Sequence, residues 1–416
     1  MSSRPASLHS EPESDHSESE SDVESESSTV VYDHESFDTF RNRVLLFVCK
    51  TIWPNAPTEN IAIERMRGGG FNRIIGLKLL VREEAVSYPM QYILRIPRFN
   101  AAQVDRDVAV LRFLQLHSSI PAPRVIRFDE TENNELKCAY MVQNRIPGTD
   151  LYKKYPKLGH DARCRLAKEL GGIFRQMLAV RSSMAGRLVL SAGDKNPNTP
   201  LHVVPFQSSN STLSTEYTDL PSTQPVKEFL TDSFQILREV ALKLDINDTI
   251  GCKIMDEFAS MATQLDSEGW LVDVPYTLAH LDLAPRNILV NLAENLEQPI
   301  ISAVLDWDSA VLAPMFMSCA PPVWLWAWQD DEDEDERLAN DKPPTPEGCQ
   351  IKQLFEAAAG HDYLKYAYEP SYRLARRLVR FAIDGVRYNE DFKEADMMLQ
   401  EWSSIHQSSN RGVLPP

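Results

Sequence analysis

The stretch LAHLDLAPRNILVN (residues 278–291) places four polar side chains between two apolar runs: His280, Asp282, Arg286 and Asn287. Phosphoryl transfer requires an acceptor for the proton of the nucleophile, ligands for Mg²⁺ and a cradle for the phosphates. Asp282, which lies on a loop, can accept the proton of the nucleophile. Asn287, at the start of the next strand, can present a carbonyl oxygen to a metal beside that loop. The spacing H-x-D-x-x-x-x-N therefore predicts a phosphotransfer site.

A second acidic motif follows nineteen residues after Asn287, where Asp306 leaves the end of the apolar segment ISAVLDW. Mg²⁺ prefers charged oxygen ligands. If the strands NILVN and SAVLDW pair, Asn287 and Asp306 lie near one another, and we expect them to hold Mg²⁺. Asp308 is either a second metal ligand or an ordinary acid at the end of a strand.

The chain has 416 residues and a net charge of −17, enough for one two-lobed domain with tails. The charge comes from two stretches, residues 1–40 and the run DDEDEDE at 330–336. The rest is formally neutral, which argues against general nucleic-acid binding. The six scattered cysteines are typical of reduced, mostly buried thiols. No apolar run is long enough to span a membrane, and we expect a soluble, cytoplasmic protein with no membrane association and no obligate protein partner.

Periodicity divides the chain into a small mixed lobe and a larger helical one. Residues 1–35 are acidic and rich in serine, which predicts a disordered tail. Over 36–145 the pattern gives a helix capped by Ser36, glycine-broken strands, a second helix and a hairpin whose turn contains Asn133 and Asn134. This order of elements predicts an N-lobe of α+β class.

Beyond IPGTDL (146–151) helices dominate, and we expect a C-lobe over 146–405 with a flexible tail over 406–416. Two stretches read as surface loop insertions, near 207–225 and 330–346. The acidic run within the second favours a solvated loop over a site for a cationic substrate. The aromatic segment PPVWLWAW (321–328) either packs in the core or contacts substrate.

The motifs containing His280, Asp282, Asn287 and Asp306 resemble those of the protein-kinase-like fold, in particular its aminoglycoside phosphotransferase/choline kinase branch. DLAPRNILV, LDWDSAVLAP and PPVWLW look like the fungal aminoglycoside-phosphotransferase-like proteins, and the resemblance covers about residues 45–400. It implies a bilobal fold with a β-rich N-lobe, and ATP and Mg²⁺ as cofactors. It also implies that Asp282 orients the acceptor hydroxyl, that Asn287 and Asp306 bind metal, and that His280 braces the loop. Arg286 either neutralises phosphate charge or pairs with a neighbouring acid.

The same resemblance assigns nucleotide-binding residues. Backbone N–H groups of GGGFN (68–72) are expected to approach the ATP phosphates. Arg95 stands where most relatives have the lysine that holds the α- and β-phosphates, with Asp107 as its acid partner, and the segment of Val142 and Asn144 is expected to meet adenine. The predicted nucleotide-site residues are Gly68, Gly69, Gly70, Asn72, Arg95, Asp107, Val142 and Asn144.

Several positions depart from the protein-kinase pattern. Leu281 replaces the arginine of H-R-D, the motif after Asp306 lacks the glycine of D-F-G, and the acceptor-side lysine is Ala284. These departures favour an ATP- and Mg²⁺-dependent phosphotransferase acting on a hydroxyl of a small molecule. Two alternatives remain. The first is a pseudoenzyme or interaction module without turnover, which the unusual pair Arg95 and Asp107 favours. The second, weaker alternative is a protein kinase.

Overall fold

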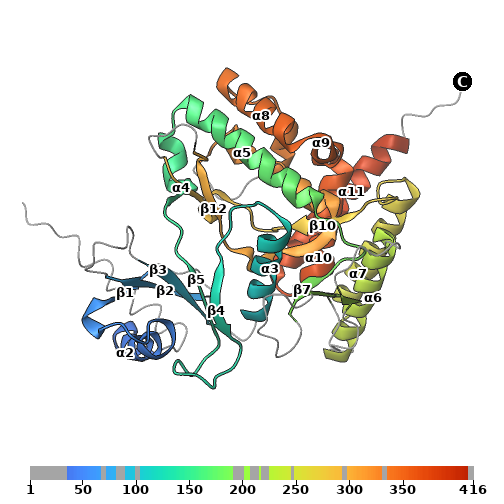
Figure 1. Ribbon diagram of the computed structural model, residues 1–416. Helices are drawn as coiled ribbons and strands as arrows, with labels where there is room; N and C mark the ends of the chain where they lie inside the picture. Colours follow the sequence, from blue (N-terminus) through green and yellow to red (C-terminus); the bar gives the residue numbers. More distant parts are fainter. Residues whose placement is uncertain are drawn as a thin grey trace, which may run out of the picture. The chain divides into compact units, whose positions relative to one another are not determined.

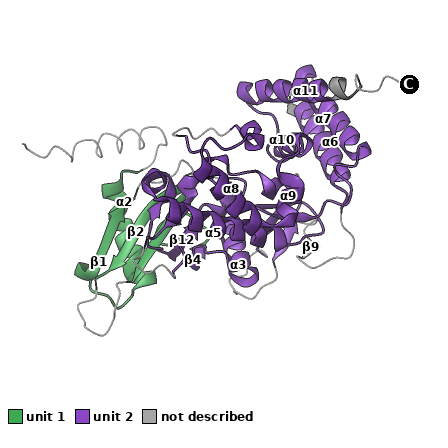
Figure 2. Ribbon diagram, turned by 90° about the horizontal axis from the view of Figure 1, so that it is seen from above, with its two compact units in different colours: residues 1–102, 129–140 green, residues 103–128, 141–416 purple. Residues whose placement is uncertain are grey.

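A computed structural model describes residues 35–66, 72–80, 90–98, 104–190, 201–206, 215–216, 224–244, 248–292, 298–329 and 335–410 (Figure 1). Most of the predicted acidic tail and the glycine run Gly68–Gly70 lie outside these ranges. The chain divides into two compact units, residues 1–102 with 129–140, and residues 103–128 with 141–416 (Figure 2). This division differs from the predicted boundary at 145, because the helix and strand after residue 103 group with the larger unit.

In the smaller unit, helix α2 (Phe37–Phe47) begins where predicted, because the Ser36 hydroxyl accepts the backbone N–H of Thr39. Its apolar side chains Phe40, Val44 and Phe47 recur at helical spacing and are buried. The helix continues as a π-helical turn, Val48–Ile52, which the apolar pattern did not indicate.

The strands of the N-terminal part are β1 (Ile61–Arg65), β2 (Asn72–Leu79), β3 (Gln91–Pro97), β4 (Val125–Asp129) and β5 (Tyr140–Asn144). The sheet has the order β1-β2-β3-β5-β4. β2 pairs antiparallel with both β1 and β3. The loop between β4 and β5 is closed by the Asn134 amide, which donates to the carbonyl oxygens of Thr131 and Cys138. The predicted α+β class is therefore confirmed.

The larger unit is mainly helical, as predicted. Its helices are α3 (Val104–His117), α4 (Leu151–Lys154), α5 (His160–Ala179), α6 (Val226–Leu244), α7 (Thr249–Ser267), α8 (Pro346–Ala359), α9 (His361–Ala367), α10 (Pro370–Asp384) and α11 (Asn389–Asn410). Helices α5 and α8 lie side by side (Figure 1). A Cβ on Gly171 of α5 would lie 2.5 Å from the Phe355 oxygen and 2.7 Å from the Ala358 Cβ, so glycine permits this close approach.

The larger unit also contains short strands, which are connected by loops. They are β6 (Thr149–Asp150), β7 (Arg187–Val189), β8 (His202–Val204), β9 (Thr215–Glu216), β10 (Tyr276–Ala279), β11 (Ile288–Val290), β12 (Ile301–Val304) and β13 (Val311–Pro314). The predicted pairing of the strands in NILVN and SAVLDW is confirmed, because β11 and β12 are antiparallel with Ile288 opposite Val304. Glu169 of α5 fixes the start of β12 by accepting the backbone N–H groups of Ile300 and Ile301.

All six cysteines are free thiols, as expected, but only Cys252 and Cys319 are buried, so the expectation of mostly buried thiols was wrong. Among the helices of the described ranges, none combines the length and apolar character required to cross a membrane.

Candidate active site

The motif at 278–291 forms a loop whose two ends are fixed by strand pairing. The chain leaves β10 at Ala279, passes through the 3-10 turn Pro285–Asn287 and enters β11. It returns in β13, where Val311 pairs with Ala279. Residues 280–310 are thus an excursion closed at its base by one strand pair and braced inside by β11 and β12. This arrangement restricts the loop from both sides.

His280 connects the two halves of this excursion. Its Nε2 donates to the Leu305 carbonyl oxygen at 2.9 Å, and its Nδ1 accepts the Asp282 backbone N–H at 3.3 Å. The side chain is buried, with the ring 4.5 Å from that of Trp307. Burial lowers the pKa of the imidazole, and a neutral ring is what the Nδ1 acceptor role requires. His280 therefore has the geometry of a brace between the loop and the end of β12.

Two donors hold the carboxylate of Asp282. Asn287 Nδ2 donates to Asp282 Oδ2 at 2.9 Å and to the Asp282 backbone oxygen at 2.8 Å. Arg286 Nη2 lies 2.6 Å from Oδ1. Of the two roles left open for Arg286, pairing with a neighbouring acid is the one that the structure contains, and that acid is Asp282 itself.

Asn287 and the Asp306 segment lie beside one another. The Leu305 N–H donates to the Asn287 backbone oxygen at 2.7 Å, so Asp306 is one residue beyond a direct contact. The Asn287 amide nitrogen is directed at Asp282, and its Oδ1 consequently points away from that carboxylate. Asp306 has a left-handed backbone, φ 62° and ψ 51°, as has Leu281 at φ 62°. Left-handed conformations of non-glycine residues cluster at functional loops.

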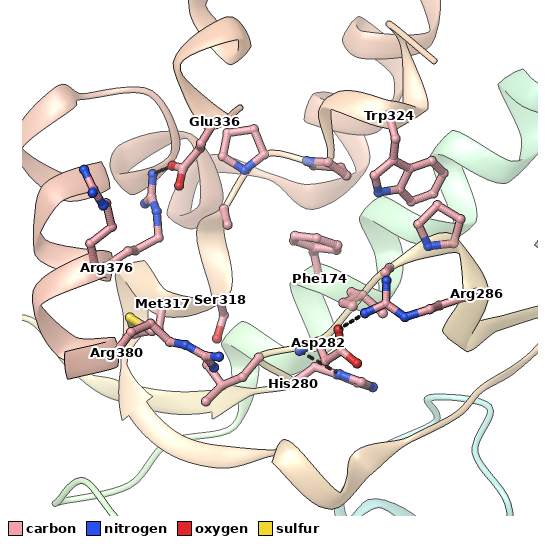
Figure 3. A pocket seen from close by; sticks show the side chains of 18 of the residues that line it. Phe174, His280, Asp282, Arg286, Met317, Ser318, Trp324, Glu336, Arg376 and Arg380 are labelled. Carbon is pink, nitrogen blue, oxygen red and sulfur yellow. Dashed lines mark hydrogen bonds and ion pairs between the residues drawn. The ribbon is translucent and has the colours of Figure 1, made fainter. Parts of the chain in front are cut away.

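A pocket of about 660 Å³ lies against this loop (Figure 3). The H-x-D-x-x-x-x-N loop, from His280 to Arg286, forms one side. Phe174 of α5 and Trp324 form an apolar wall, and α10 contributes arginines opposite. Figure 3 shows Asp282 at one end of this space with its bond to Arg286. The volume is in the range of pockets that take small molecules.

The predicted nucleotide residues are placed only in part. Gly68, Gly69 and Gly70 lie outside the described residues. Asn72 opens β2 and Arg95 lies in β3, opposite Ile74. Asp107 lies in the first turn of α3, and both Arg95 and Asp107 are buried. Val142 and Asn144 lie in β5, where the Asn144 N–H donates to the Arg124 oxygen at 3.0 Å.

Two parts of the pocket were not recognised in the sequence. The first is the row of arginines on α10, Arg376, Arg377 and Arg380; Arg380 follows the other two by four and three residues, a spacing that indicates one side of a helix. The second is the acidic segment: Glu336 begins a 3-10 helix, lines the pocket and pairs with Arg376, and is therefore not part of a solvated loop. In the aromatic segment, Trp324 and Trp326 are buried, and Trp324 and Trp328 also line the pocket, so it serves both packing and pocket.

The N-terminal antiparallel sheet, the helical larger unit and the braced H-x-D-x-x-x-x-N loop define a protein-kinase-like fold. The sequence profile of the phosphotransferase enzyme family matches residues 77–347, most of the chain, and the protein belongs to that family. The predicted family resemblance is thereby confirmed.

The comparisons with known sequences and solved structures gave the following. No curated protein sequence matches it significantly. The GDP complex of aminoglycoside 2'-phosphotransferase-IIIa is 13% identical, with 87% of this chain and 97% of that chain covered and a TM-score of 0.45. Aminoglycoside phosphotransferase APH(4)-Ia is 16% identical, with 90% and 100% covered and a TM-score of 0.45. The streptomycin–ATP complex of APH(2")-IIa is 12% identical, with 86% and 95% covered and a TM-score of 0.45.

Proposed function

We propose that the protein transfers the γ-phosphate of ATP, in the presence of Mg²⁺, to a hydroxyl group of a small molecule. One observation carries this proposal: the Asp282 carboxylate lines a pocket of small-molecule size and is held there by Asn287 and Arg286. A carboxylate fixed at two oxygens is oriented before the acceptor arrives, and such positioning is the main contribution that a protein makes to phosphoryl transfer.

In the proposed reaction the acceptor hydroxyl lies against Asp282. Its oxygen forms a bond to the γ-phosphorus as its proton passes to the Asp282 carboxylate. The bond between the γ-phosphorus and the bridging oxygen breaks, and both electrons leave with ADP. Arg286 keeps Asp282 in place and offsets negative charge close to the transferred group. His280 acts on the reaction only by positioning, because both of its ring nitrogens are engaged within the loop.

The donor set near Asp282 fits a magnesium ion. The Asn287 carbonyl oxygen and the Asp306 carboxylate are hard oxygen donors of the kind that Mg²⁺ takes, together with phosphate oxygens and water. The described residues contain no group of three or more His, Cys, Asp or Glu arranged for a metal ion, so the site relies on this amide and carboxylate with the nucleotide. When bound, Mg²⁺ would offset the charge of the phosphates.

The nucleotide would be bound by the residues assigned from the sequence. Backbone groups of Gly68, Gly69, Gly70 and Asn72 would approach the phosphates, and Arg95, supported by Asp107, would contact the α- and β-phosphates. Backbone groups from Val142 to Asn144 would contact adenine. Arginine remains charged at all relevant pH values and can bind phosphate with two parallel hydrogen bonds, so its presence in place of lysine is compatible with nucleotide binding.

Two measurements test the proposal together. Mg·ATP should raise the unfolding midpoint of the full chain, because a ligand that binds only the native state stabilises it, and Asp306→Asn should reduce that shift when Mg²⁺ is limiting. ADP release should then increase with at least one compound of a hydroxyl-containing metabolite panel. A midpoint shift without any ADP release would instead favour a binding module without turnover, and no shift at millimolar Mg·ATP would refute nucleotide binding.

A further inference from the structure

The pocket beside Asp282 has two chemically different walls. Helix α10 contributes Arg376, Arg377 and Arg380, and the facing wall is apolar, with Phe174 and Trp324 (Figure 3). A ligand that fills this space therefore meets guanidinium groups on one side and aromatic rings on the other. The catalytic loop lies at one end of both walls.

The carboxylates that line the pocket are already engaged. Asp282, Glu336, Asp384 and Glu394 each form an ion pair with a lining arginine, and Asp391 accepts the backbone N–H groups of Arg387 and Tyr388. A cationic ligand would have to compete with a covalently tethered guanidinium, or with backbone donors, for every one of them. The number of acidic side chains therefore overstates the attraction of this pocket for cations.

Arg380 is the lining arginine best placed to take an anion. Its side chain is 48% exposed and pairs with Asp384, itself 54% exposed, through Nε at 3.4 Å. Exposed pairs of this kind contribute little and exchange readily. The pair is recorded at Nε, and the two terminal nitrogens form a planar fork that matches carboxylate and phosphate. Figure 3 shows Arg380 extending from α10 toward the end of the pocket where His280 and Asp282 lie.

Asp384 has a second cationic neighbour besides Arg380. Burial lowers the pKa of Arg187, and the charges of Arg106 and Arg387 lower it as well, whereas the charge of Asp384 raises it. Asp384 therefore interacts with the Arg187 guanidinium as well as with Arg380, and Arg380 is not the only cation that offsets its charge.

We propose that the phosphate acceptor carries an anionic group, a carboxylate or a phosphate, which Arg380 binds while the apolar body of the acceptor packs against Trp324 and Phe174. The inference rests on the proposed function, since it names the class of compound whose hydroxyl reaches Asp282. Arg380 is then a specificity-determining residue, and polycationic acceptors are disfavoured.

Four matched aromatic alcohols test this on the full chain without nucleotide: para-(hydroxymethyl)benzoate, para-(hydroxymethyl)phenyl phosphate, para-(hydroxymethyl)benzamide and para-(aminomethyl)benzyl alcohol. Their affinities are measured by ligand-observed NMR titration. We expect at least one of the two anions to bind about tenfold more tightly than the amide and the amine, as charge-assisted hydrogen bonds allow. The tighter anion identifies whether the bound group is a carboxylate or a phosphate.

Three variants connect the preference to one side chain. Arg380→Gln should reduce it to about twofold or less, and Arg380→Lys should keep part of it because the charge remains without the fork. Arg181→Gln is the matched control: Arg181 is 41% exposed, pairs with Asp362 at 3.3 Å and does not line the pocket. Its preference should equal that of the wild type.

Equal affinity for the four compounds, tightest binding of the amine, no binding of either anion, or a preference that survives Arg380→Gln would each overturn the inference. ADP release in the presence of Mg·ATP is measured separately with the same compounds. An anion preference without ADP release from any hydroxyl compound counts against the proposed function, whereas ADP release that is highest with the amine counts against the anionic acceptor alone.

Discussion

The Nη2 atom of Arg286 lies 2.6 Å from Oδ1 of Asp282, so the proposed base is paired with a cation four residues away on the same loop. The side chains are 44% and 36% exposed, and such a pair contributes less than about 1 kcal/mol to stability. Its effect should therefore appear in activity rather than in folding.

Arg286→Ala should lower kcat for ADP release by roughly 10- to 100-fold, because the Asp282 carboxylate loses one of its two donors and nearby phosphate charge loses a neutralising group. The change in unfolding free energy should stay below about 1 kcal/mol. Steady-state kinetics and urea unfolding of the same preparation measure both. Arg181→Ala serves as the control, and unchanged kcat in Arg286→Ala would show that the pair has no part in catalysis.

His280 predicts a pH dependence of stability. Burial lowers its pKa in the folded protein, so the unfolded chain binds the proton first as pH falls below about 6.5. The stability that the neutral ring contributes is thus complete above that pH and decreases below it. His280→Gln should destabilise by about 1–3 kcal/mol near neutral pH.

The difference in unfolding free energy between the wild type and His280→Gln should shrink by up to about 1.4 kcal/mol from roughly pH 7.5 to pH 5.5. Over this range the wild type loses the stability contributed by the neutral ring, and the variant has no such ring to protonate. Urea unfolding of both proteins at the two pH values measures the difference. A deficit that is constant, or that grows at acid pH, would contradict a buried neutral imidazole.

Arg376 binds three segments of the chain, and replacing it should strongly lower the free energy of unfolding. It is 4% exposed, donates to the carbonyl oxygens of Phe316, Tyr366 and Ala367 at 3.2, 2.9 and 3.0 Å, and pairs with Glu336. Arg376→Met leaves these acceptors and a carboxylate without their donor and should cost about 3–5 kcal/mol in urea unfolding. Arg181→Met should cost less than about 0.5 kcal/mol. Equal effects of the two would refute the buried network.

Gly171 and Gly172 are adjacent in α5, but their replacement by alanine should change stability in opposite directions. A Cβ on Gly171 would lie 2.5 Å from the Phe355 oxygen, whereas a Cβ on Gly172 has nothing within 4 Å. Gly172→Ala should stabilise by about 0.5–1 kcal/mol through helix propensity. Gly171→Ala should instead destabilise by about 1–3 kcal/mol, because α8 has to move away. Urea unfolding tests the pair, and the same sign for both would mean that α5 and α8 do not approach this closely.

The arrangement of the H-x-D-x-x-x-x-N loop and its flanking strands could be predicted, because the residues that define it are close together in the sequence. His280, Asp282 and Asn287 lie within eight residues, and the apolar runs that become β11 and β12 flank the turn, so their pairing followed from the order of the elements. The αL backbone of Leu281 had no signal, since leucine does not favour it.

Contacts between distant segments were not predictable from local patterns. Glu169 is one of two acids on α5, and nothing in the sequence indicates that it accepts the backbone N–H groups of Ile300 and Ile301. The arginines of α10 read as an ordinary polar helix face, because nothing in SYRLARRLVRF states that Glu336 and the catalytic loop lie opposite. The acidic run was assigned to solvent for the same reason, although Glu336 neutralises a buried guanidinium.

The central claim concerns Asp282. Single-turnover ADP release from Mg·ATP, in the presence of a hydroxyl compound that supports ADP release by the wild type, tests it most directly when Asp282→Asn is compared with the wild type. The substitution keeps the shape of the side chain and removes the proton acceptor, so the rate should fall by roughly 10²–10⁴-fold, the range that general base catalysis supplies. The unfolding midpoint should remain within a few degrees of the wild type, showing that the fold is intact. A variant that releases ADP as fast as the wild type would contradict the account.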